Sequence, residues 1–202
     1  MFPIAANRSD EEGQLYSDDV FSTYLYTGNG STQTINNGID LAGKGGMVWF
    51  KSRSTTDNHA LVDTTRGTRY TLVSSSAAAQ VDQGASPITA LSSGFSLDGG
   101  YSNINSVRSF ASWTFRKAAK IFDVVTYTGT GSARTIAHSL GVAPGCMFIK
   151  CTSTSGDWIV LHRDLLSTGQ MLNLNTTAAP QSNTVLNNWT STGFEIGYGS
   201  TS

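Results

Sequence analysis

The stretch Tyr26-Thr-Gly-Asn-Gly-Ser-Thr-Gln-Thr-Ile35 occurs again, in closely similar form, as Tyr127-Thr-Gly-Thr-Gly-Ser-Ala-Arg-Thr-Ile136. The two copies lie about 100 residues apart, a period typical of repeated domains and too long for the units of a solenoid. Each copy contains glycines in a turn pattern, flanked by residues that favour strands. The sequence therefore predicts two repeats, each opening on this phrase and its turn.

Short apolar runs follow the two copies at matching places. In the first copy, Met47-Val-Trp-Phe-Lys51 predicts a buried strand, and Ser93-Gly-Phe-Ser-Leu97 predicts a turn followed by a strand. Their counterparts are Met147-Phe-Ile-Lys150 and Thr192-Gly-Phe-Glu-Ile196. Helical periodicity is almost absent. We therefore predict an all-β protein with two tandem β-sandwich domains of a jelly-roll or lectin-like type, with an immunoglobulin-like sandwich as the second choice.

The repeats set the domain boundaries. Residues 1–23 have no counterpart and form a short N-terminal arm, 24–120 form the first β-sandwich repeat, and 121–202 form the second. The first repeat ends on an alternating aromatic run, Arg108–Arg116, which predicts a closing strand; the second repeat lacks it. A sheet without its last strand exposes an edge and an apolar groove. Either the chain is the front part of a longer protein, the reading we favour, or a neighbouring subunit supplies the strand.

Charge and hydropathy exclude several classes of function. Only 13% of the 202 residues are charged, compared with about 25% in an average globular protein, and the formal net charge is −1. Nothing in this balance attracts a polyanion, so we expect no nucleic-acid partner. The first residues, Met1-Phe-Pro-Ile4, lack the features of a signal peptide, and no apolar run is long enough to predict a membrane span.

The two cysteines, Cys146 and Cys151, predict free thiols. On one strand they would point to opposite faces, too far apart to form a disulfide. We expect both thiols to be buried, which agrees with synthesis in a reducing cytosol.

The histidines are weak candidates for catalysis. His59 corresponds to Trp158 in the second repeat, and His162-Arg-Asp164 corresponds to Asp63-Thr-Thr65, so neither pattern is kept between the repeats. His138-Ser139 has no acid nearby in the sequence that would complete a triad, and no Gly-x-Ser-x-Gly elbow is present. His59 is therefore interpreted as a packing or hydrogen-bonding residue.

Acidic and metal-binding patterns are equally weak. The acid pairs Glu11/Glu12 and Asp18/Asp19 lie in the arm, outside both predicted repeats, where they cannot face one cleft as glycosidase carboxylates do. No His-x-x-x-His or Cys-x-x-Cys spacing occurs. We therefore predict a protein that is not an enzyme, with no catalytic residue, no metal site and no cofactor.

Two sets of apolar residues are candidate contact sites. Aromatic side chains that are candidates for stacking on sugars, with core or interface packing as the commoner alternative, are Tyr101, Trp158, Trp189 and Tyr198. Apolar residues of the arm that are candidates for attachment to another protein are Phe2, Pro3, Ile4, Leu15, Tyr16 and Phe21. These are the binding residues that the sequence predicts.

Several stretches carry a resemblance to a known group of proteins. In the first repeat they are Asp19-Val-Phe-Ser-Thr-Tyr-Leu-Tyr-Thr-Gly-Asn-Gly-Ser-Thr-Gln-Thr-Ile35, Gly38-Ile-Asp-Leu41, Val48-Trp-Phe-Lys51, Asp63-Thr-Thr-Arg-Gly67 and Ser112-Trp-Thr-Phe-Arg-Lys117. In the second they are Phe122-Asp-Val-Val-Thr-Tyr-Thr-Gly129, Ala137-His-Ser-Leu-Gly-Val-Ala-Pro-Gly145 and Asp157-Trp158. Over residues 19–202 the chain resembles the tandem lectin-like domains of virion appendage proteins in tailed phages, notably marine phages and cyanophages.

The resemblance implies a structural role in a virion. A tail fibre or tail appendage component would be made in the host cytoplasm, would form a homo-oligomer, with a trimer as the expected form, and would attach through its N-terminal region. The partners implied are other virion proteins, namely a tail adaptor, nozzle or baseplate, and a host surface glycan. The alternatives are a capsid decoration or cement protein and a carbohydrate-binding module that recognises the receptor.

Overall fold

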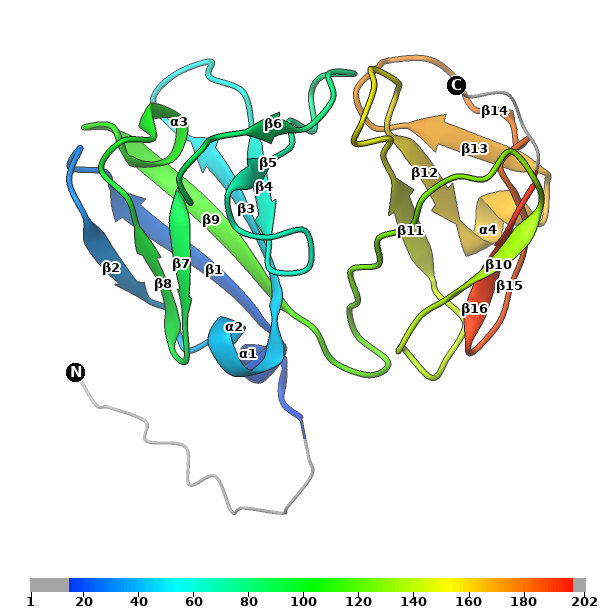
Figure 1. Cartoon of the computed structure of the whole chain (residues 1–202), viewed down its shortest axis with the longest axis horizontal. Coiled ribbons are helices and arrows are strands. Elements are labelled where there is room, and N and C mark those ends of the chain that lie inside the picture. Colours follow the sequence, from blue (N-terminus) through cyan, green and yellow to red (C-terminus); the bar gives the residue numbers. More distant parts are fainter. Residues whose placement is uncertain (1–14, 198–202) are drawn as a thin grey trace.

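The protein is built mainly from antiparallel β-strands (Figure 1). The computed structural model describes residues 15–197, and strands account for 38% of it and four short helices for 9%. The all-β class predicted from the sequence is therefore confirmed. Strands of residues 21–116 lie on one side in Figure 1, and strands of residues 134–196 lie on the other.

The first repeat contains a four-stranded antiparallel sheet with the order β1-β9-β3-β4. Its strands are β1 (Phe21–Thr27), β9 (Ser109–Arg116), β3 (Gly46–Ser52) and β4 (Ala60–Asp63). In β3 buried and half-buried residues alternate, which is the period of a strand with one face on the core. The aromatic strand β9 is not the last strand of the sheet, since it lies between β1 and β3 and pairs with both.

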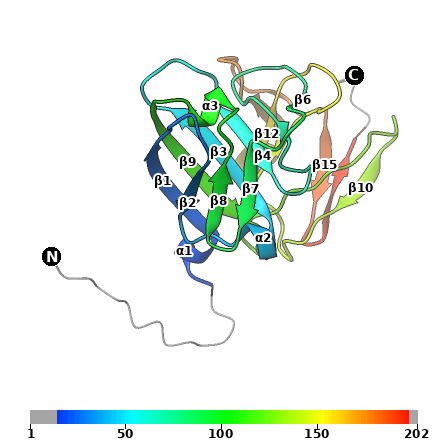
Figure 2. The same cartoon turned by 60° about the vertical axis from the view of Figure 1, so that its left-hand side comes forward.

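A smaller sheet covers one face of this sheet, as Figure 2 shows. It has the order β2-β8-β7, with β2 (Gln33–Asn36), β8 (Gly94–Leu97) and β7 (Ile88–Leu91). The remaining elements of this repeat are the strand pair β5 (Tyr70–Thr71) and β6 (Val81–Asp82), and the helices α1 (Ser17–Val20), α2 (Leu41–Lys44) and α3 (Ser102–Asn105).

The first hydrophobic core lies between these two sheets. It takes Val48, Phe50, Ala60 and Val62 from the larger sheet, and Ile35, Ile88, Phe95 and Leu97 from the smaller. Phe50 and Phe95 are fully buried and meet edge to face, with ring centroids 5.4 Å apart. Such a pair contributes about 0.5–1.5 kcal/mol beyond the burial of its area. The two sheets are therefore held together by side chains from alternate positions of their strands.

The second repeat has sheets of the same sizes. One is three-stranded, with β10 (Arg134–Ala137), β16 (Gly193–Ile196) and β15 (Leu186–Trp189) in the order β10-β16-β15. The other has the order β11-β12-β13-β14, with β11 (Cys146–Ile149), β12 (Ile159–His162), β13 (Gln170–Asn173) and β14 (Gln181–Ser182); α4 (Arg163–Leu166) follows β12. A second hydrophobic core joins them through residues such as Ile136, Leu161, Met171 and Phe194.

The repeats differ at the position of β9. The strand β11 corresponds to β3, because Trp49 lies opposite Leu61 and Phe148 lies opposite Val160 in the same register. β3 has a neighbour on each side, whereas β11 is the end strand of its sheet among the described residues. Residues 122–128, the counterpart of β1, form no strand. Among the described residues, β11 therefore pairs only with β12, and the segment that corresponds to β1 joins no sheet.

The glycine turn of the repeated phrase connects two strands that belong to different sheets. It leads from β1 in the larger sheet to β2 in the smaller one, so the two flanking strands do not pair with each other. The fully buried Asn105 holds this turn: its side-chain amide donates to the carbonyl oxygen of Ser31 at 2.7 Å and its side-chain oxygen accepts from Gln33 at 2.6 Å. Gly30 has a φ of +69°, a conformation that glycine adopts without strain.

The first strand begins earlier than predicted. β1 starts at Phe21, inside the segment assigned to the arm, because Phe21 pairs with Phe115 of β9. Their ring centroids are 4.9 Å apart. The first strand of the first repeat therefore begins inside the segment 1–23.

Candidate functional site

A small apolar cluster joins the two repeats. It contains Leu61 and Leu72 of the first repeat and Trp158 of the second, with Met47, Trp49 and Leu174 packed around them. Trp158 is only 4% exposed, and its indole N–H donates to the carbonyl oxygen of Val73 at 2.9 Å. A buried tryptophan that both packs and donates a hydrogen bond fixes its position and its direction. We call this group the inter-repeat cluster.

Hydrogen bonds between two loops extend this contact. The backbone N–H of Gln80 donates to Thr152 at 3.0 Å, and that of Gly156 donates to Ala77 at 2.8 Å. The Lys150 ammonium donates to the same carbonyl of Ala77 at 3.2 Å. The small residues around Ala77 allow the two backbones to approach this closely. The repeats are therefore connected by main-chain bonds as well as by apolar packing.

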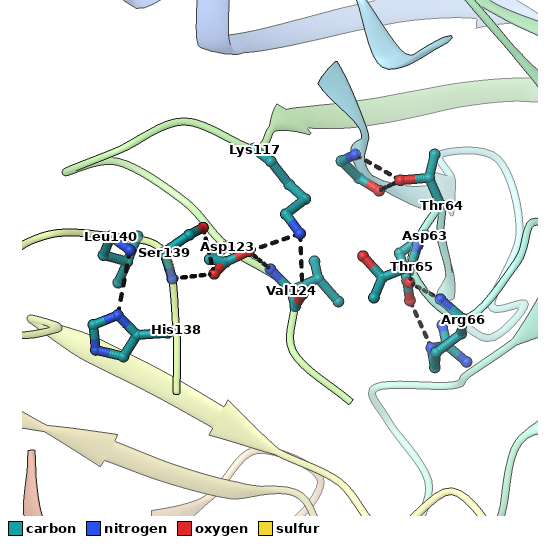
Figure 3. A network of polar contacts seen from close by, with 11 residues as sticks. Asp63, Thr64, Thr65, Arg66, Lys117, Asp123, Val124, His138, Ser139 and Leu140 are labelled. Atoms are coloured by element: carbon teal, nitrogen blue, oxygen red, sulfur yellow. Dashed lines mark hydrogen bonds and ion pairs between the residues drawn. The ribbon is translucent and has the colours of Figure 1, made fainter. Parts of the chain in front are cut away.

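The connection between the repeats carries a polar network (Figure 3). Lys117, just after β9, forms an ion pair with Asp123 at 2.9 Å. Asp123 also accepts from the backbone N–H and the hydroxyl of Ser139, both at 2.8 Å. Burial would raise the pKa of Asp123, but the hydrogen bonds from Ser139 and Lys117 outweigh it and hold the pKa below its usual range. The carboxylate therefore stays charged and links Lys117, at the end of the first repeat, to Ser139 in the second.

An acid does lie beside the pair His138-Ser139, contrary to the expectation from the sequence. Asp123 bonds to Ser139 directly, while the imidazole of His138 points elsewhere. Its Nδ1 accepts from the N–H of Leu140 at 3.3 Å, and its Nε2 lies 3.2 Å from the carbonyl oxygen of Thr190. A catalytic triad needs the histidine between the hydroxyl and the acid. This arrangement is a structural network of the loop.

The other two histidines also contact neighbouring parts of the fold. The Nδ1 of His59 accepts from the indole N–H of Trp49 at 2.8 Å, as expected for a hydrogen-bonding residue. Burial, followed by the charge of Lys51, lowers the pKa of His59. His162 precedes α4, where its Nδ1 accepts from the N–H of Asp164 at 3.3 Å. These contacts give each imidazole a local structural role.

The predicted glycan-stacking residues do not form a platform. Trp158 is buried in the inter-repeat cluster, so it is not available to stack on a sugar, and the alternative of interface packing holds for it. Tyr101 is half-buried against the first core, and its hydroxyl donates to Thr71 at 3.4 Å. Trp189 is half-buried against the second core. Tyr198 lies outside the described residues.

The predicted arm residues fall into two groups. Phe2, Pro3 and Ile4 lie outside the described residues. Leu15, Tyr16 and Phe21 are 47%, 38% and 38% exposed, so each presents apolar surface close to the start of β1. The exposed side chains leave attachment through this region as a prediction.

Both cysteines are exposed, which corrects the expectation of buried thiols. Cys146 opens the end strand β11, and Cys151 lies beyond that strand in a loop, where apolar neighbours do not enclose it. The hydroxyl of Thr154, at 3.1 Å from the sulfur, and that of Ser153 lower the pKa of Cys151 to about 7. Burial raises the pKa of Cys146. The two thiols therefore differ in reactivity.

A shallow groove of about 580 Å³ lies in the first repeat beside α2 and β7. Apolar, glycine and hydroxyl residues line it, among them Leu41, Gly45, Thr68 and Ile88. No acid, imidazole or cation contributes to the lining, so the groove offers no acid–base chemistry. Within residues 15–197, no three or more His, Cys, Asp or Glu side chains gather as metal ligands would. The helices described, each four residues long, fall short of the length and apolar character needed to cross a bilayer.

The fold and these contacts define an all-β protein of antiparallel sheets with an apolar connection between its repeats. Residues 16–202 match a family described as a domain of unknown function (DUF7483), and the chain belongs to this family. No curated protein and no solved structure matches the chain.

The sequence did not reveal the residues that connect the repeats. Lys117 and Asp123 stand close together in the sequence with opposite charges, and this was the one available signal for their ion pair. For Trp158 the signal was the exchange with His59 between the repeats. A residue that contacts the other repeat has no reason to be kept in both.

Proposed function

We propose that the chain is a structural component of a tailed-phage virion, a tail fibre or tail appendage, built from two tandem lectin-like β-sandwiches. Two sheets share one core in each repeat, which supports the sandwich assignment. The resemblance of residues 19–202 to virion appendage domains supports the location. The N-terminal segment attaches the chain to a tail adaptor, nozzle or baseplate, and the assembled form is a homo-oligomer, with three copies as the expected number.

The observation that carries this proposal is the inter-repeat cluster. Domains within one chain usually move against each other unless a large apolar interface holds them. Here Trp158, the loop bonds at Ala77 and the Lys117–Asp123 ion pair act together over one connection. An appendage that transmits force along its length needs coupled modules of this kind, whereas an enzyme that closes on a substrate needs a hinge.

The exposed surface is consistent with a role in assembly. Few residues are charged, and described side chains such as Leu15, Leu25 and Phe148 present apolar area to the surroundings. The polar groups described above are engaged in local structure, and the groove beside α2 has no acid or base. We therefore assign the chain a non-enzymatic role.

Detection in purified particles tests the proposal. Antibodies against residues 15–197 are applied to particles of the phage that encodes the chain, and gold labels are located by electron microscopy, with the major capsid protein as the control antigen. Label at the tail supports the proposal. Label spread over the capsid lattice would establish a decoration protein instead, and absence of the chain from purified particles by mass spectrometry would refute a virion role.

A glycan array separates the receptor-binding alternative. Binding that a Trp189→Ala substitution abolishes, with the unfolding temperature unchanged, would identify a carbohydrate-binding module. We expect no such loss, because Trp189 packs against the second core and does not stand free as a stacking platform.

A further inference from the structure

Within residues 15–197, the end strand β11 has backbone groups on one side that pair with no other strand. The N–H of Arg163 donates to the carbonyl oxygen of Gly145 at 3.0 Å, as the N–H of Thr64 does to Gly46 in the first repeat. Backbone groups of successive residues point to opposite sides of an antiparallel strand. The N–H and C=O groups of Cys146, Phe148 and Lys150 therefore point away from β12, toward the side where β9 lies in the first repeat. Such a row of groups is a template for another strand.

The side chains of β11 are also uncovered compared with those of β3. On the core face, Val48 and Phe50 are 1% and 0% exposed, whereas Met147 and Ile149 at the same positions remain half-buried. On the opposite face, Phe148 is 47% exposed. Its counterpart Trp49 is partly buried and packs against Trp113 of β9, with ring centroids 6.4 Å apart.

Residues 122–128 are the second segment outside the sheets: Phe122 forms an isolated bridge with Ala118, and the carbonyl oxygen of Val124 accepts from Lys117. Residues 122–128 correspond to β1, which pairs with β9 over its whole length in the first repeat. The side chain of Val125 packs against the second core, and the ring of Tyr127 lies 6.1 Å from that of Phe194. The segment is therefore anchored by its side chains but forms no strand. A strand placed beside β11 would pair with this segment on its other side.

An exposed cation lies at the open edge. A side chain added at Gly46 would meet the carbonyl oxygen of Phe115 in β9, whereas one added at Gly145 would meet the guanidinium of Arg163. Charged side chains at sheet edges prevent unwanted strand pairing in natural proteins. Such protection is useful where the edge is filled only on assembly with another molecule, because a strand from the same chain would fill it during folding. The flexible Arg163 side chain can move aside when a strand arrives.

We propose that the open edge of β11 binds an extended strand donated by a neighbouring polypeptide. The donor runs antiparallel to β11 and pairs with residues 122–128 on its other side. The side chains of β9 indicate which residue types the donor should carry. In β9, Phe110, Ser112 and Thr114 face the core, whereas Trp113 and Phe115 face outward. The donor thus places an aromatic residue on Tyr127, as Phe110 stacks on Tyr26 at 5.3 Å, and a second one beside Phe148. This inference does not depend on the proposed place in a virion.

A peptide with the sequence of β9 tests the proposal on the full 202-residue chain. The probe is a synthetic Ser109–Arg116 peptide with two lysines added at each end for solubility and a fluorescein label. Fluorescence anisotropy measures its affinity, and hydrogen exchange measures the protection of backbone amides. We expect saturable binding, with slower exchange at Phe148, at Lys150 and across residues 122–128.

Three substitutions locate the binding. Phe148→Pro removes an N–H that faces the open edge and takes no part in the β12 ladder, a position where an edge strand tolerates proline. It should weaken binding at least tenfold, on the order of the loss of one or two strand hydrogen bonds. Phe148→Ala is the matched control, which keeps the N–H and should weaken binding by less. Arg163→Ser removes the guarding cation and should strengthen binding.

The outcomes are decisive in both directions. If Phe148→Pro does not fold, the same residue pair is tested from the other side by a peptide with proline in place of Trp113, which removes the N–H that would donate to the Phe148 carbonyl oxygen and should bind at least tenfold more weakly. Absence of saturable binding, equal affinity for the normal chain and Phe148→Pro, or protection in β3 instead of β11 would overturn the proposal. So would a natural polypeptide in which residues beyond Ser202 protect the same amides, since the strand would then come from the same molecule.

Discussion

Truncation of Trp158 to alanine removes the one second-repeat side chain that is fully enclosed in the inter-repeat cluster. The indole packs against Leu61 and Leu72 and donates to the carbonyl of Val73 at 2.9 Å. Alanine leaves a cavity at this contact and an unpaired carbonyl. We therefore expect a loss of stability together with a loss of coupling between the repeats.

The magnitude follows from the area that the indole buries. A buried aromatic side chain removes about 150–250 Å² from water, and at about 25 cal/mol per Å² this amounts to about 4–6 kcal/mol. This is an upper value, because an unfolded chain already covers part of its apolar surface. Trp→Ala substitutions in protein cores cost about 3–5 kcal/mol, and we expect a value in that range. The hydrogen bond contributes about 1 kcal/mol of it.

Urea unfolding followed by circular dichroism and tryptophan fluorescence measures the effect. The normal chain should unfold in one transition, and Trp158→Ala should show two, because the repeats then unfold separately. Trp158→Phe is the matched control, which keeps most of the packing and loses the indole donor, so it should cost about 1–2 kcal/mol. A loss below about 1 kcal/mol for Trp158→Ala, with a single transition, would refute the coupling.

Three other predictions test separate parts of the structure. Gly46→Ala should destabilise the chain by about 1–3 kcal/mol, because the added Cβ meets the β9 backbone. Gly145→Ala should cost less, since its Cβ meets only the flexible side chain of Arg163. Free energies of unfolding compare the two variants, and equal costs would contradict the claim that no strand lies beside β11. Iodoacetamide should alkylate Cys151 faster than Cys146, because the thiolate is the reactive form and the pKa of Cys151 is lowered to about 7 while that of Cys146 is raised. Peptide mass spectrometry should show a Cys151 rate that rises through pH about 7 and then levels off. Equal rates at the two cysteines would contradict the assigned thiol environments. The folded state lowers the pKa of His59, so the unfolded chain binds the proton more readily. The contribution of His59 to the free energy of unfolding should be fully present above pH about 6.5 and fall as the pH drops below it. Urea unfolding of His59→Asn should show a weaker fall over the same pH range.

The sequence predicted the class of the fold because that information is local. Alternating runs such as Met47-Val-Trp-Phe-Lys51 report one buried face, and the run became β3. Comparing the repeats predicted a difference at the closing strand, and among the described residues β3 has β9 beside it whereas β11 has no strand on that side. What the repeats could not show was where β9 sits, because strand order depends on pairing between distant segments. The aromatic run was expected to close the first repeat, yet it lies inside the sheet.

The candidate site was less predictable than the fold. The sequence left Trp158 open between sugar stacking and core or interface packing, because residue type does not encode exposure and the residues that bury Trp158 belong to the other repeat. The thiols were expected to be buried because free cysteine is commonly a small buried apolar residue, whereas β11 ends at Ile149 before Cys151, and Cys146 opens this end strand. The contact of Asp123 with Ser139 was not predicted, because the two residues lie side by side only after the chain has folded.

Hydrogen exchange at two matched amides tests the central claim that the second repeat has an open edge where the first repeat has β9. The amide of Trp49 lies between β3 and β9, and the amide of Phe148 occupies the same position in β11. The account predicts that Trp49 exchanges only by extensive unfolding of its sheet, while Phe148 exchanges orders of magnitude faster. Equal protection of the two amides in the isolated 202-residue chain would contradict the account.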